Sequence, residues 1–416
     1  MSQLAIAEKY RILLVFPLPF RRSPFFQAMF RSVAAVVGTG FIGPVHIEGL
    51  LRAGVRVQGV LGTSVEKSRH TAQQFGLQRA YASFGELLDD SEVDCVHLTS
   101  PNRFHFEQAI QCLDAGKHVL CEKPLAMNSA ESRELVRRAK IANVLTAVNY
   151  NVRFYPVCIE AAQLVERGDV GDVFHVTGSY VQDWLHKDTD FNWRVLANEG
   201  GALRALADIG THWLDLVQTI CKLNVQSVCA DLQTVYPVRH PPLGTTETFS
   251  GKTHREIRPG ESTLIDTEDF GSVLLRFHNG ARGVMHVSQV SAGHKNTIRW
   301  EIAGSKQCLA WNSQHPDELW IGHRDEPNQT LLRDPGLLSG AARAHAQYPG
   351  GHNEGFPDTF KQLFRSFYSA IESRVSVDRG ELAIYPTFED GHREILMCEA
   401  ILKSAREHRW VDLDDA

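Results

Sequence analysis

Short unbroken apolar runs alternate with longer segments of helical periodicity through residues 33–149 of the chain. Unbroken apolar runs are typical of strands that are buried on both faces, as in a parallel sheet. Strands that alternate with helices in this way predict a doubly wound parallel α/β sheet. The segments predicted to be strands are Val33–Val37, Val55–Leu61, Asp94–Thr99, His118–Cys121 and Val144–Asn149.

Amphipathic segments separate these strands, and each of them is predicted to form a helix. Gly116 follows one such segment, as glycine commonly follows a helix, and Ser129 is predicted to cap the start of another. The expected helices run from the glycine-rich segment 38–43 to about Ala53 and over Lys67–Phe75, Phe84–Leu88, Phe104–Ala115 and Ser129–Asn143.

The second part of the chain has a different pattern, in which several strands follow one another without helices between them. Asn279-Gly280 separates two such runs and is typical of a tight hairpin. We therefore expect an α+β domain with a large, mostly antiparallel open sheet, and loops at 183–201, 237–262 and 324–352. Its helices are predicted over Pro156–Arg167, Ala205–Cys221, Asp358–Ser373 and Thr387–His408, and its strands over Val173–Tyr180, Val225–Leu232, Phe270–Phe277, Ala281–Val290, Thr297–Gly304 and Gln307–Trp311.

The length of 416 residues allows two to three domains at about 150 residues each. The change of pattern indicates two, a nucleotide-binding domain at 32–154 and a second domain at 155–416. The first 31 residues lie outside both. Their apolar stretch is followed by two arginines and no small-x-small cleavage site, so we expect a disordered extension rather than an export signal.

Composition and charge exclude several classes of protein. The chain carries 43 Lys+Arg and 49 Asp+Glu, a net charge of −6, which argues against nucleic-acid binding. It has no run of 18 apolar residues, so no membrane span is expected. Its 8 cysteines lack zinc-site spacing. We therefore expect reduced thiols, no metal site and a cytoplasmic location.

The segment Gly38-Thr39-Gly40-Phe41-Ile42-Gly43 has the pattern GxGxxG. It follows a predicted strand, opens a predicted helix and lies in a βαβ unit, which is the context of a dinucleotide-binding loop. The glycines allow a tight turn and close approach of a pyrophosphate to the N-terminus of the helix. A glycine-rich turn without a ligand is the alternative.

The second predicted strand ends in Leu61-Gly62-Thr63-Ser64, without the acidic residue that commonly binds the 2′-hydroxyl of NAD. This absence removes the repulsion of a 2′-phosphate and slightly favours NADP over NAD. The residues placed to contact the ribose or its phosphate are Thr63, Ser64, Lys67 and Arg69. The alternative is that Lys67 and Arg69 are solvated helix residues.

Two segments carry candidate catalytic residues. Glu122-Lys123-Pro124 ends the fourth predicted strand, at the ligand-binding edge of an open α/β sheet. Lys123 can donate there to a substrate oxygen. The alternative is that this segment is an exposed turn without a catalytic role. In the second segment Asp208, His212 and Asp215 are spaced to share one helical face. His212 can act as general base and Asp208 can orient it or hold a hydroxyl, while a metal site or a packed histidine are the alternatives.

Together, these motifs resemble the glucose–fructose oxidoreductase and inositol dehydrogenase family (Gfo/Idh/MocA). The resemblance runs from about Val33 to Leu413. It implies a Rossmann domain joined to an α/β domain whose open sheet often mediates assembly, here as a homodimer or homotetramer. The missing ribose acid and the N-terminal extension depart from the family pattern. The resemblance rests on the GTGFIG loop, Thr99-Ser100-Pro101-Asn102 with His105, Gly116–Val119, Glu122-Lys123-Pro124, Asn149 through Phe154, and Asp208–His212.

The resemblance also implies roles for individual residues. Lys123, Asp208 and His212 are expected around the nicotinamide and the sugar. The residues expected to contact the cofactor, besides the glycine loop, are Thr99, Ser100, Pro101, Asn102, His105, Glu122, Lys123, Trp193 and Arg194.

Other side chains are candidates for binding sugar hydroxyls or stacking on a sugar ring. These are Asn149, Arg153 and Trp184, together with His186 and Asp188. Arg153 can instead be a structural cation facing a carboxylate, and Trp184 can be a core residue between the domains. His294-Lys295-Asn296 can lie at the rim of the pocket.

The sequence therefore predicts an NAD(P)-dependent dehydrogenase or reductase that acts on a sugar, polyol or keto-sugar. Two alternatives come from other classes. One is an NAD-dependent glycoside hydrolase on the same scaffold, and the other is a non-catalytic NAD(P)-binding sensor, which would not need to keep both Lys123 and His212.

Overall fold

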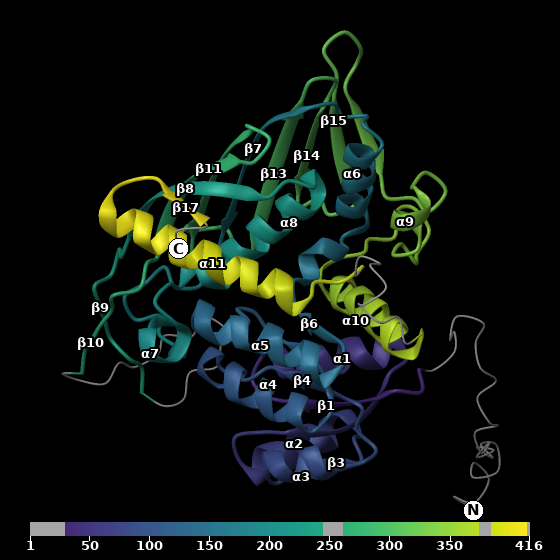
Figure 1. The fold of residues 1–416 in the computed structure, drawn as a ribbon, viewed down its shortest axis with the longest axis vertical. Coiled ribbons are helices and arrows are strands. Elements are labelled where there is room, and N and C mark those ends of the chain that lie inside the picture. The colour runs from purple at the N-terminus through teal and green to yellow at the C-terminus, as the bar shows by residue number, and fades with distance from the viewer. Residues whose placement is uncertain (1–29, 244–260, 374–383, 414–416) are drawn as a thin grey trace, which may run out of the picture.

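The computed structural model describes residues 30–243, 261–373 and 384–413. They form two stacked bodies, with the first part of the chain at the bottom of Figure 1 and the larger sheet above it. The lower body contains a six-stranded parallel sheet of order β3-β2-β1-β4-β5-β6. This confirms the predicted doubly wound sheet. Its strands are β1 (Val33–Val37), β2 (Arg56–Leu61), β3 (Arg79–Tyr81), β4 (Cys95–Leu98), β5 (His118–Cys121) and β6 (Thr146–Val148).

The helices of this body match the predicted segments, with one correction at a helix start. Asn128, and not Ser129, caps α5, because Asn128 has extended backbone and its side chain accepts from the backbone N of Glu131. Ser129 is the first helical residue. The helices are α1 (Ile42–Ala53), α2 (Val65–Phe75), α3 (Phe84–Asp89), α4 (His105–Asp114) and α5 (Ser129–Ala142).

The upper body is built on a nine-stranded sheet of order β16-β15-β14-β13-β7-β12-β11-β8-β17. Its strand pairs are antiparallel except for the parallel pair β7–β12. The predicted large, mostly antiparallel open sheet is therefore confirmed. The strands are β7 (Val173–Val181), β8 (Val225–Gln233), β11 (Phe270–Phe277), β12 (Arg282–Ser288), β13 (Thr297–Gly304), β14 (Cys308–Asn312), β15 (Glu318–Gly322), β16 (Gln329–Leu332) and β17 (Val411–Asp412).

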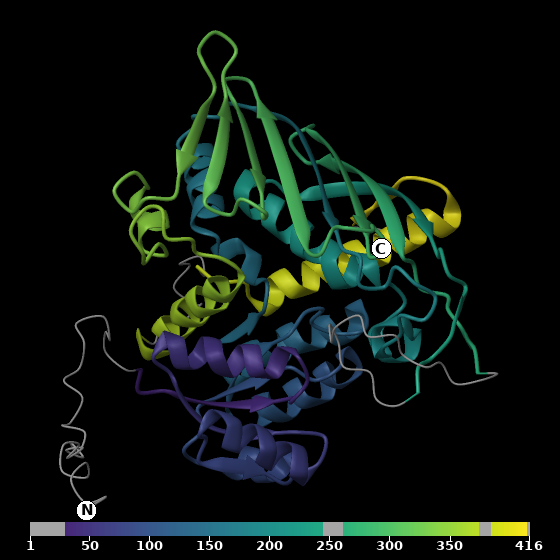
Figure 2. The same ribbon diagram turned by 180° about the vertical axis from the view of Figure 1, so that it is seen from behind.

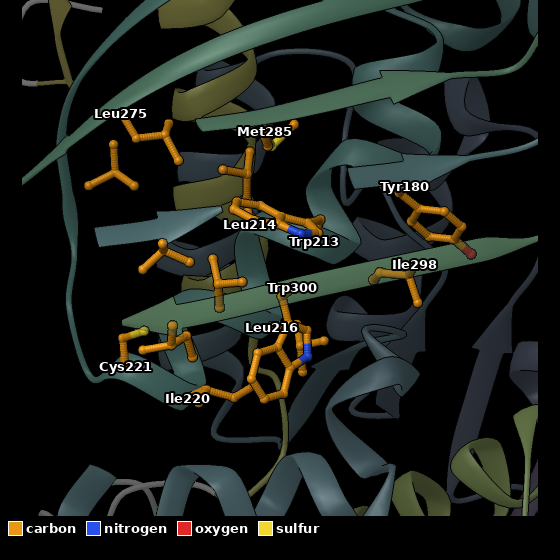
Figure 3. Close-up of a cluster of buried hydrophobic side chains, with 14 of the residues drawn as sticks. Tyr180, Trp213, Leu214, Leu216, Ile220, Cys221, Leu275, Met285, Ile298 and Trp300 are labelled. Atoms are coloured by element: carbon orange, nitrogen blue, oxygen red, sulfur yellow. The ribbon is translucent and has the colours of Figure 1, made fainter. Parts of the chain in front are cut away.

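Helices α6 (Pro156–Glu166), α8 (Thr211–Cys221) and α11 (Phe388–Glu407) cover one face of this sheet (Figure 1). Trp213 of α8 packs there against Met285 and Trp300 of the sheet (Figure 3). The fit is close, since a Cβ added to Gly178 would lie 2.4 Å from the indole nitrogen of Trp213. In the described part of the chain, no helix covers the opposite face (Figure 2), which exposes Leu274, Val284 and Trp320.

All three predicted loops contain some regular structure, and 183–201 includes the short helix α7 (Ala197–Gly200). Residues 324–352 include β16 and the short helix α9 (Gly340–Arg343), whereas a loop was expected throughout. In the predicted loop 237–262, β9 (Val238–Arg239) pairs with β10 (Thr263–Leu264). The remainder of that loop, 244–260, lies outside the described residues. These strands are short and each gains its pairing from a partner that the local sequence does not reveal.

Helix α10 (Phe356–Ser373) follows the upper sheet in the chain but packs on the lower body, against α1. Phe360, Phe364 and Phe367 join the core beneath β1 and β2. A Cβ added to Gly49 of α1 would lie 2.9 Å from the Phe364 ring, so this packing depends on the glycine. The first domain in space therefore includes a helix from the far end of the chain.

The predicted N-terminal extension lies outside the described residues, apart from its last two positions. Phe30 packs on Tyr368 of α10 with ring centroids 5.9 Å apart. The backbone nitrogen of Arg31 donates to Glu372 at 2.5 Å. Both residues thus contact α10. None of the described helices combines the length and apolarity needed to cross a membrane.

Candidate active site

A cavity of about 390 Å³ lies between the two bodies, at the carboxyl ends of the parallel strands. Ligands bind at this edge in open α/β sheets, where the strand order reverses. The three predicted catalytic residues, Lys123, Asp208 and His212, all line it. The other lining residues are Phe41, Ile42, Thr99, Ser100, Asn102, Glu122, Asn149, Asn151, Tyr180, Gln182, Trp193, Arg194, Ile209, Lys295, Asn296, Phe356 and Phe360.

The glycine loop connects β1 to α1 beside this cavity, and its three glycines serve different purposes. Gly38 has φ 121°, and a Cβ there would lie 2.3 Å from Thr99 Oγ1. A Cβ on Gly43 would lie 2.1 Å from the carbonyl oxygen of Gly38, so both positions require glycine for packing. Gly40 has nothing within 4 Å of an added Cβ. The loop therefore leaves open space for the close approach of a pyrophosphate, and the residues fit a dinucleotide.

The end of β2 carries the residues expected near the adenosine ribose. Thr63, Ser64, Lys67 and Arg69 are all exposed. Ser64 caps α2, because its hydroxyl oxygen accepts from the backbone N of Lys67 at 3.3 Å. This cap leaves the side chains of Lys67 and Arg69 on the surface of the first turns of α2, with no carboxylate at the strand end itself.

The segment after β4 is held by internal hydrogen bonds. Thr99 Oγ1 donates to the carbonyl oxygen of Val37 at 2.8 Å, and Asn102 Nδ2 donates to that of Gly200 at 2.8 Å. Pro101 precedes a short 3₁₀ turn and is absent from the cavity lining. His105 does not face the cavity either, since its ring nitrogens lie against two backbone carbonyls. This buried ring connects the loop to the Lys123-Pro124 segment, and a contact of His105 with the cofactor stays a prediction.

Lys123 and Asp208 form an ion pair across the two bodies. Lys123 precedes a cis-proline bond, and its Nζ lies 2.8 Å from both the backbone oxygen and Oδ1 of Asp208. Arg194 Nε lies 3.6 Å from the same Oδ1. Burial alone would raise the pKa of Asp208, but the neighbouring Lys123 and Arg194 charges outweigh burial and lower that pKa to about 2. The carboxylate is therefore ionised and fixes the lysine ammonium at the cavity.

His212 is buried in the cavity wall and is not oriented by Asp208, contrary to one of the predicted roles. Residues Leu206–Gly210 form a π-turn (η4), and α8 begins at Thr211, so the regular α-helical spacing of Asp208 and His212 is lost. Asp208 Oδ2 instead accepts from Gln289 Nε2 at 2.8 Å. Nδ1 of His212 has no partner among the described residues. Burial and the Lys123 charge lower the pKa of His212 to about 3, so the ring is neutral.

Glu122 and Asn149 form a buried pair on the lower side of the cavity. Asn149 Nδ2 donates to Glu122 Oε1 at 2.5 Å, and His46 Nε2 lies 3.0 Å from the same oxygen. Burial would raise the pKa of Glu122, but the hydrogen bond and charge of His46 lower it to about 2. Oδ1 of Asn149 has no partner in the described structure, so it is an acceptor available to a ligand. Sequence reasoning missed His46, although it lies one turn into the helix that the glycine loop opens.

Arg153 is a structural cation, which was the alternative to its predicted role in sugar binding. Its guanidinium makes a two-pronged contact with the Asp215 carboxylate and reaches Asp390 Oδ1 at 3.3 Å. It is absent from the cavity lining. The carboxylate of Asp215 thus faces Arg153 and does not join Asp208 and His212 in the site.

Replacing Arg153 by methionine is expected to lower the free energy of unfolding by roughly 3–5 kcal/mol, because it leaves the buried Asp215 carboxylate without its partner. Urea denaturation measures this. Arg137→Met is the control, because its ion pair with Glu134 is exposed, and exposed pairs contribute about 1 kcal/mol or less. Equal, small effects of both variants would contradict the assigned role.

The aromatic and polar residues of segment 183–188 do not line the cavity either. Trp184 packs against Leu185 and donates its indole N–H to Gln182 at 2.8 Å. His186 Nδ1 contacts the backbone oxygen of Val290. Trp184, His186 and Asp188 are absent from the cavity lining, and their binding of sugar stays a prediction. Trp193 and Arg194, further along the same loop, do line the cavity.

The far wall consists of residues that the motifs did not identify. Tyr180 and Gln182 stand at the end of β7, and both donate to Asn296 Oδ1, at 2.8 and 2.7 Å. Lys295 and Asn296 line the cavity, in agreement with a rim position. Phe356 and Phe360 of α10 also line the cavity. No local sequence pattern could indicate that they lie there. The described residues contain no group of three or more His, Cys, Asp or Glu side chains that could hold a metal.

Comparison with known proteins identifies the family that has this architecture. Residues 33–150 match the family described as "Oxidoreductase family, NAD-binding Rossmann fold", and 158–310 match the GFO/IDH/MocA C-terminal domain. Levoglucosan dehydrogenase of Pseudarthrobacter phenanthrenivorans is 29% identical over 355 residues, which cover 84% of this chain and 87% of that protein. Myo-inositol 2-dehydrogenase of Thermotoga maritima is 26% identical over 381 residues, 91% of this chain and 98% of that protein.

Solved structures give the same result. A levoglucosan dehydrogenase in complex with NADH superposes with a TM-score of 0.81 and 26% identity, over 92% of this chain and 99% of that one. A complex of levoglucosan dehydrogenase with NADH and levoglucosan gives a TM-score of 0.80. The parallel sheet, the glycine loop, the large open sheet and the two domain matches lead to one conclusion: the chain belongs to the Gfo/Idh/MocA oxidoreductase family.

Proposed function

We propose that the protein is a nicotinamide-dependent oxidoreductase that interconverts a CH–OH group and a carbonyl in a sugar, polyol or keto-sugar. The observation that carries this proposal is the Lys123–Asp208 ion pair beside the neutral His212, in a cavity that opens at the glycine loop. The similar proteins are named as levoglucosan and myo-inositol dehydrogenases, which supports this substrate class.

The residues of the lower body would hold the cofactor. Gly40 leaves room for the pyrophosphate, and Phe41, Ile42, Thr99, Ser100 and Asn102 continue along the cavity towards Glu122. When bound, the nicotinamide supplies the acceptor or donor of a hydride, and the protein supplies orientation and electrostatics. We assign this role to residues 32–154, completed by α10, and substrate binding and assembly to the remainder of 155–416.

The residues around the reacting carbon would handle charge and protons. His212, being neutral, accepts the hydroxyl proton of the alcohol. The Lys123 ammonium stabilises the negative charge that develops on that oxygen, and Asp208 keeps the ammonium in place. Asn149, with a free acceptor at Oδ1, accepts from a neighbouring hydroxyl. The weak basicity of His212 suffices because Lys123 lowers the pKa of the alcohol at the same time.

The proposal is tested by incubating the purified protein with NAD or NADP and a panel of sugars, polyols and anhydrosugars. Formation of the reduced cofactor is followed by its absorbance. We expect at least one polyhydroxylated substrate to reduce the cofactor at the expense of one alcohol group. A chain that binds the cofactor but oxidises no member of such a panel, and reduces no keto-sugar, would contradict the proposal.

The choice of cofactor is part of the same proposal. Lys67 and Arg69 are exposed beside the end of β2, where no carboxylate repels a 2′-phosphate. We expect NADP to bind more tightly than NAD, and Lys67→Ala with Arg69→Ala to weaken NADP binding roughly 5-fold while NAD binding is unchanged. Titration calorimetry measures both constants. A tighter complex with NAD, as in the NADH complexes of similar proteins, would overturn this preference.

We further propose that the protein forms a homodimer or homotetramer through the open face of the large sheet. Leu274 and Val284 are exposed there as a cross-strand pair, and Trp320 is exposed further along the same face. Exposed apolar patches commonly mark interfaces. Its eight cysteines are unpaired, which supports a reducing, cytoplasmic location.

A further inference from the structure

Gln289 is a fully buried amide directly after β12, outside every motif described above. Its side-chain Nε2 donates to Asp208 Oδ2 at 2.8 Å. The other oxygen of that carboxylate accepts from Lys123 Nζ, also at 2.8 Å. Gln289 and Lys123 therefore each donate to a different oxygen of the Asp208 carboxylate. Because an ionised carboxylate is only an acceptor, the amide must present its NH₂ group to Asp208.

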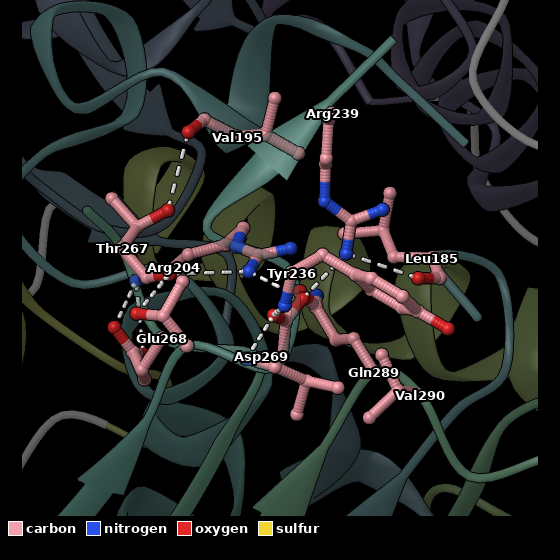
Figure 4. A network of polar contacts seen from close by, with 12 residues as sticks. Leu185, Val195, Arg204, Tyr236, Arg239, Thr267, Glu268, Asp269, Gln289 and Val290 are labelled. Atoms are coloured by element: carbon pink, nitrogen blue, oxygen red, sulfur yellow. Dashed lines mark hydrogen bonds and ion pairs between the residues drawn. The ribbon is translucent and has the colours of Figure 1, made fainter. Parts of the chain in front are cut away.

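The backbone of Gln289 is held by a buried polar network (Figure 4), whose labelled residues are absent from the cavity lining. Gln289 N donates to the backbone oxygen of Asp269 at 3.0 Å, and Leu185 N donates to that of Gln289 at 3.1 Å. The Asp269 carboxylate accepts from the guanidinium groups of Arg204 and Arg239 at 2.5 and 2.6 Å, with all three side chains fully buried. Such a network leaves the backbone beside Gln289 little freedom to move.

The same network fixes the backbone of Asp208. Its N–H donates to the carbonyl oxygen of Arg204 at 2.7 Å, and Arg204 is one of the two cations on Asp269. The main chain of Asp208 and the residue Gln289, whose amide donates to its side chain, are thus both hydrogen-bonded to the Arg204–Asp269 network. The orientation of the carboxylate, and with it the place of the Lys123 ammonium, is set from outside the cavity.

We propose that Gln289 is a positioning residue, whose amide fixes the Asp208 carboxylate so that Lys123 is held at the reacting oxygen. The kinetic consequence rests on the proposed function, whereas the effect on Lys123 itself does not. The charged or titratable groups around Asp208 are Lys123, Arg194, His212 and Tyr180. Of the donors to its carboxylate, Gln289 is the uncharged one, so it orients Asp208 without competing with Lys123 for charge.

The decisive variant is Gln289→Glu, because its new carboxyl group can act in two ways. At low pH the two facing carboxyl groups share one proton, as close carboxylates do, and the protonated group donates to Asp208 as the amide does. At higher pH the proton leaves and two anions face each other. We expect kcat close to that of the wild type at low pH and a fall of roughly 10- to 100-fold as pH rises.

Gln289→Leu cannot donate at any pH, so its kcat is expected to be lower by the same factor throughout. Gln58→Leu is the control, since Gln58 is a buried amide of β2 that does not line the cavity. It loses a buried amide without touching Asp208 and is expected to keep wild-type kcat. Wild-type kcat in both Gln289 variants at every pH would overturn the proposal, and so would a fall in Gln289→Glu that does not recover at low pH.

A second readout needs no turnover and separates this proposal from the proposed function. Reductive ¹³C-methylation labels the lysine amines, and NMR reports the environment of Lys123 in the intact protein. We expect the Lys123 resonance to shift in Gln289→Leu and to stay in place in Gln58→Leu. An unchanged resonance in Gln289→Leu would show that Gln289 does not position Lys123, whatever reaction the protein catalyses.

Discussion

Substituting Lys123 by methionine should lower kcat by roughly 10³-fold, which is typical for the loss of a donor that stabilises developing negative charge. Methionine fills a similar volume but carries no ammonium group. The Asp208 carboxylate would then keep only the Gln289 donor at 2.8 Å and the Arg194 charge at 3.6 Å. The alkoxide would form without the Lys123 ammonium group, so the effect falls on the chemical step rather than on binding.

Steady-state kinetics on the best substrate, together with the dissociation constant of the reduced cofactor, tests this expectation. We expect cofactor binding to change little, because the glycine loop is intact. Lys140→Met is the matched control, since Lys140 is exposed and pairs with Glu389 far from the cavity. If Lys123→Met turned over as fast as the control, Lys123 would not be a catalytic residue.

The second large effect is expected for His212→Asn, which should lower kcat by roughly 10²–10⁴-fold, the range for removal of a general base. Asparagine retains polarity but cannot take up a proton at this position. Because the pKa of His212 is lowered to about 3, the ring is already deprotonated in the free wild-type enzyme at neutral pH. The profile of kcat/KM should therefore have no acidic limb from His212 near pH 6.5, its ordinary pKa.

The control for His212→Asn is His392→Asn, a histidine of α11 that contacts Ser132 and does not line the cavity. It should leave kcat unchanged. An acidic limb near pH 6.5 that disappears in His212→Asn would show that the pKa of His212 is not lowered by its surroundings. Undiminished kcat in His212→Asn would exclude it as the base.

The parts of the fold that depend on local sequence could be predicted. Five of the six strands of the parallel sheet follow from unbroken apolar runs, and the glycine loop follows from its place between the first strand and the first helix. The short strand β3 has no such run and was not predicted. What could not be predicted depends on partners far away in the chain. Helix α10 is amphipathic, but nothing in its sequence says that Phe364 packs against Gly49 of α1. The short strand β16 owes its existence to pairing with β15.

The candidate site shows the same division. Lys123, Asp208 and His212 were identified from spacing and resemblance, and the structure brings them to one cavity. Their mutual contacts were not predictable, because the π-turn at Leu206–Gly210 shifts Asp208 away from a regular helical relation to His212. Gln289 carried no signal, since a glutamine after a strand belongs to no motif. For Arg153 the sequence left sugar binding and a structural role open. The structure places Asp215 against it, which decides for the structural role.

Isotope labelling follows the transfer of a hydrogen from the substrate to the cofactor. A substrate identified in the panel is prepared with deuterium at its carbinol carbons and incubated with the protein and oxidised cofactor. We expect one deuterium per molecule at the nicotinamide ring of the reduced cofactor, together with one carbonyl in the product. Cleavage of a glycoside with the cofactor unchanged, and with deuterium lost to solvent, would contradict it.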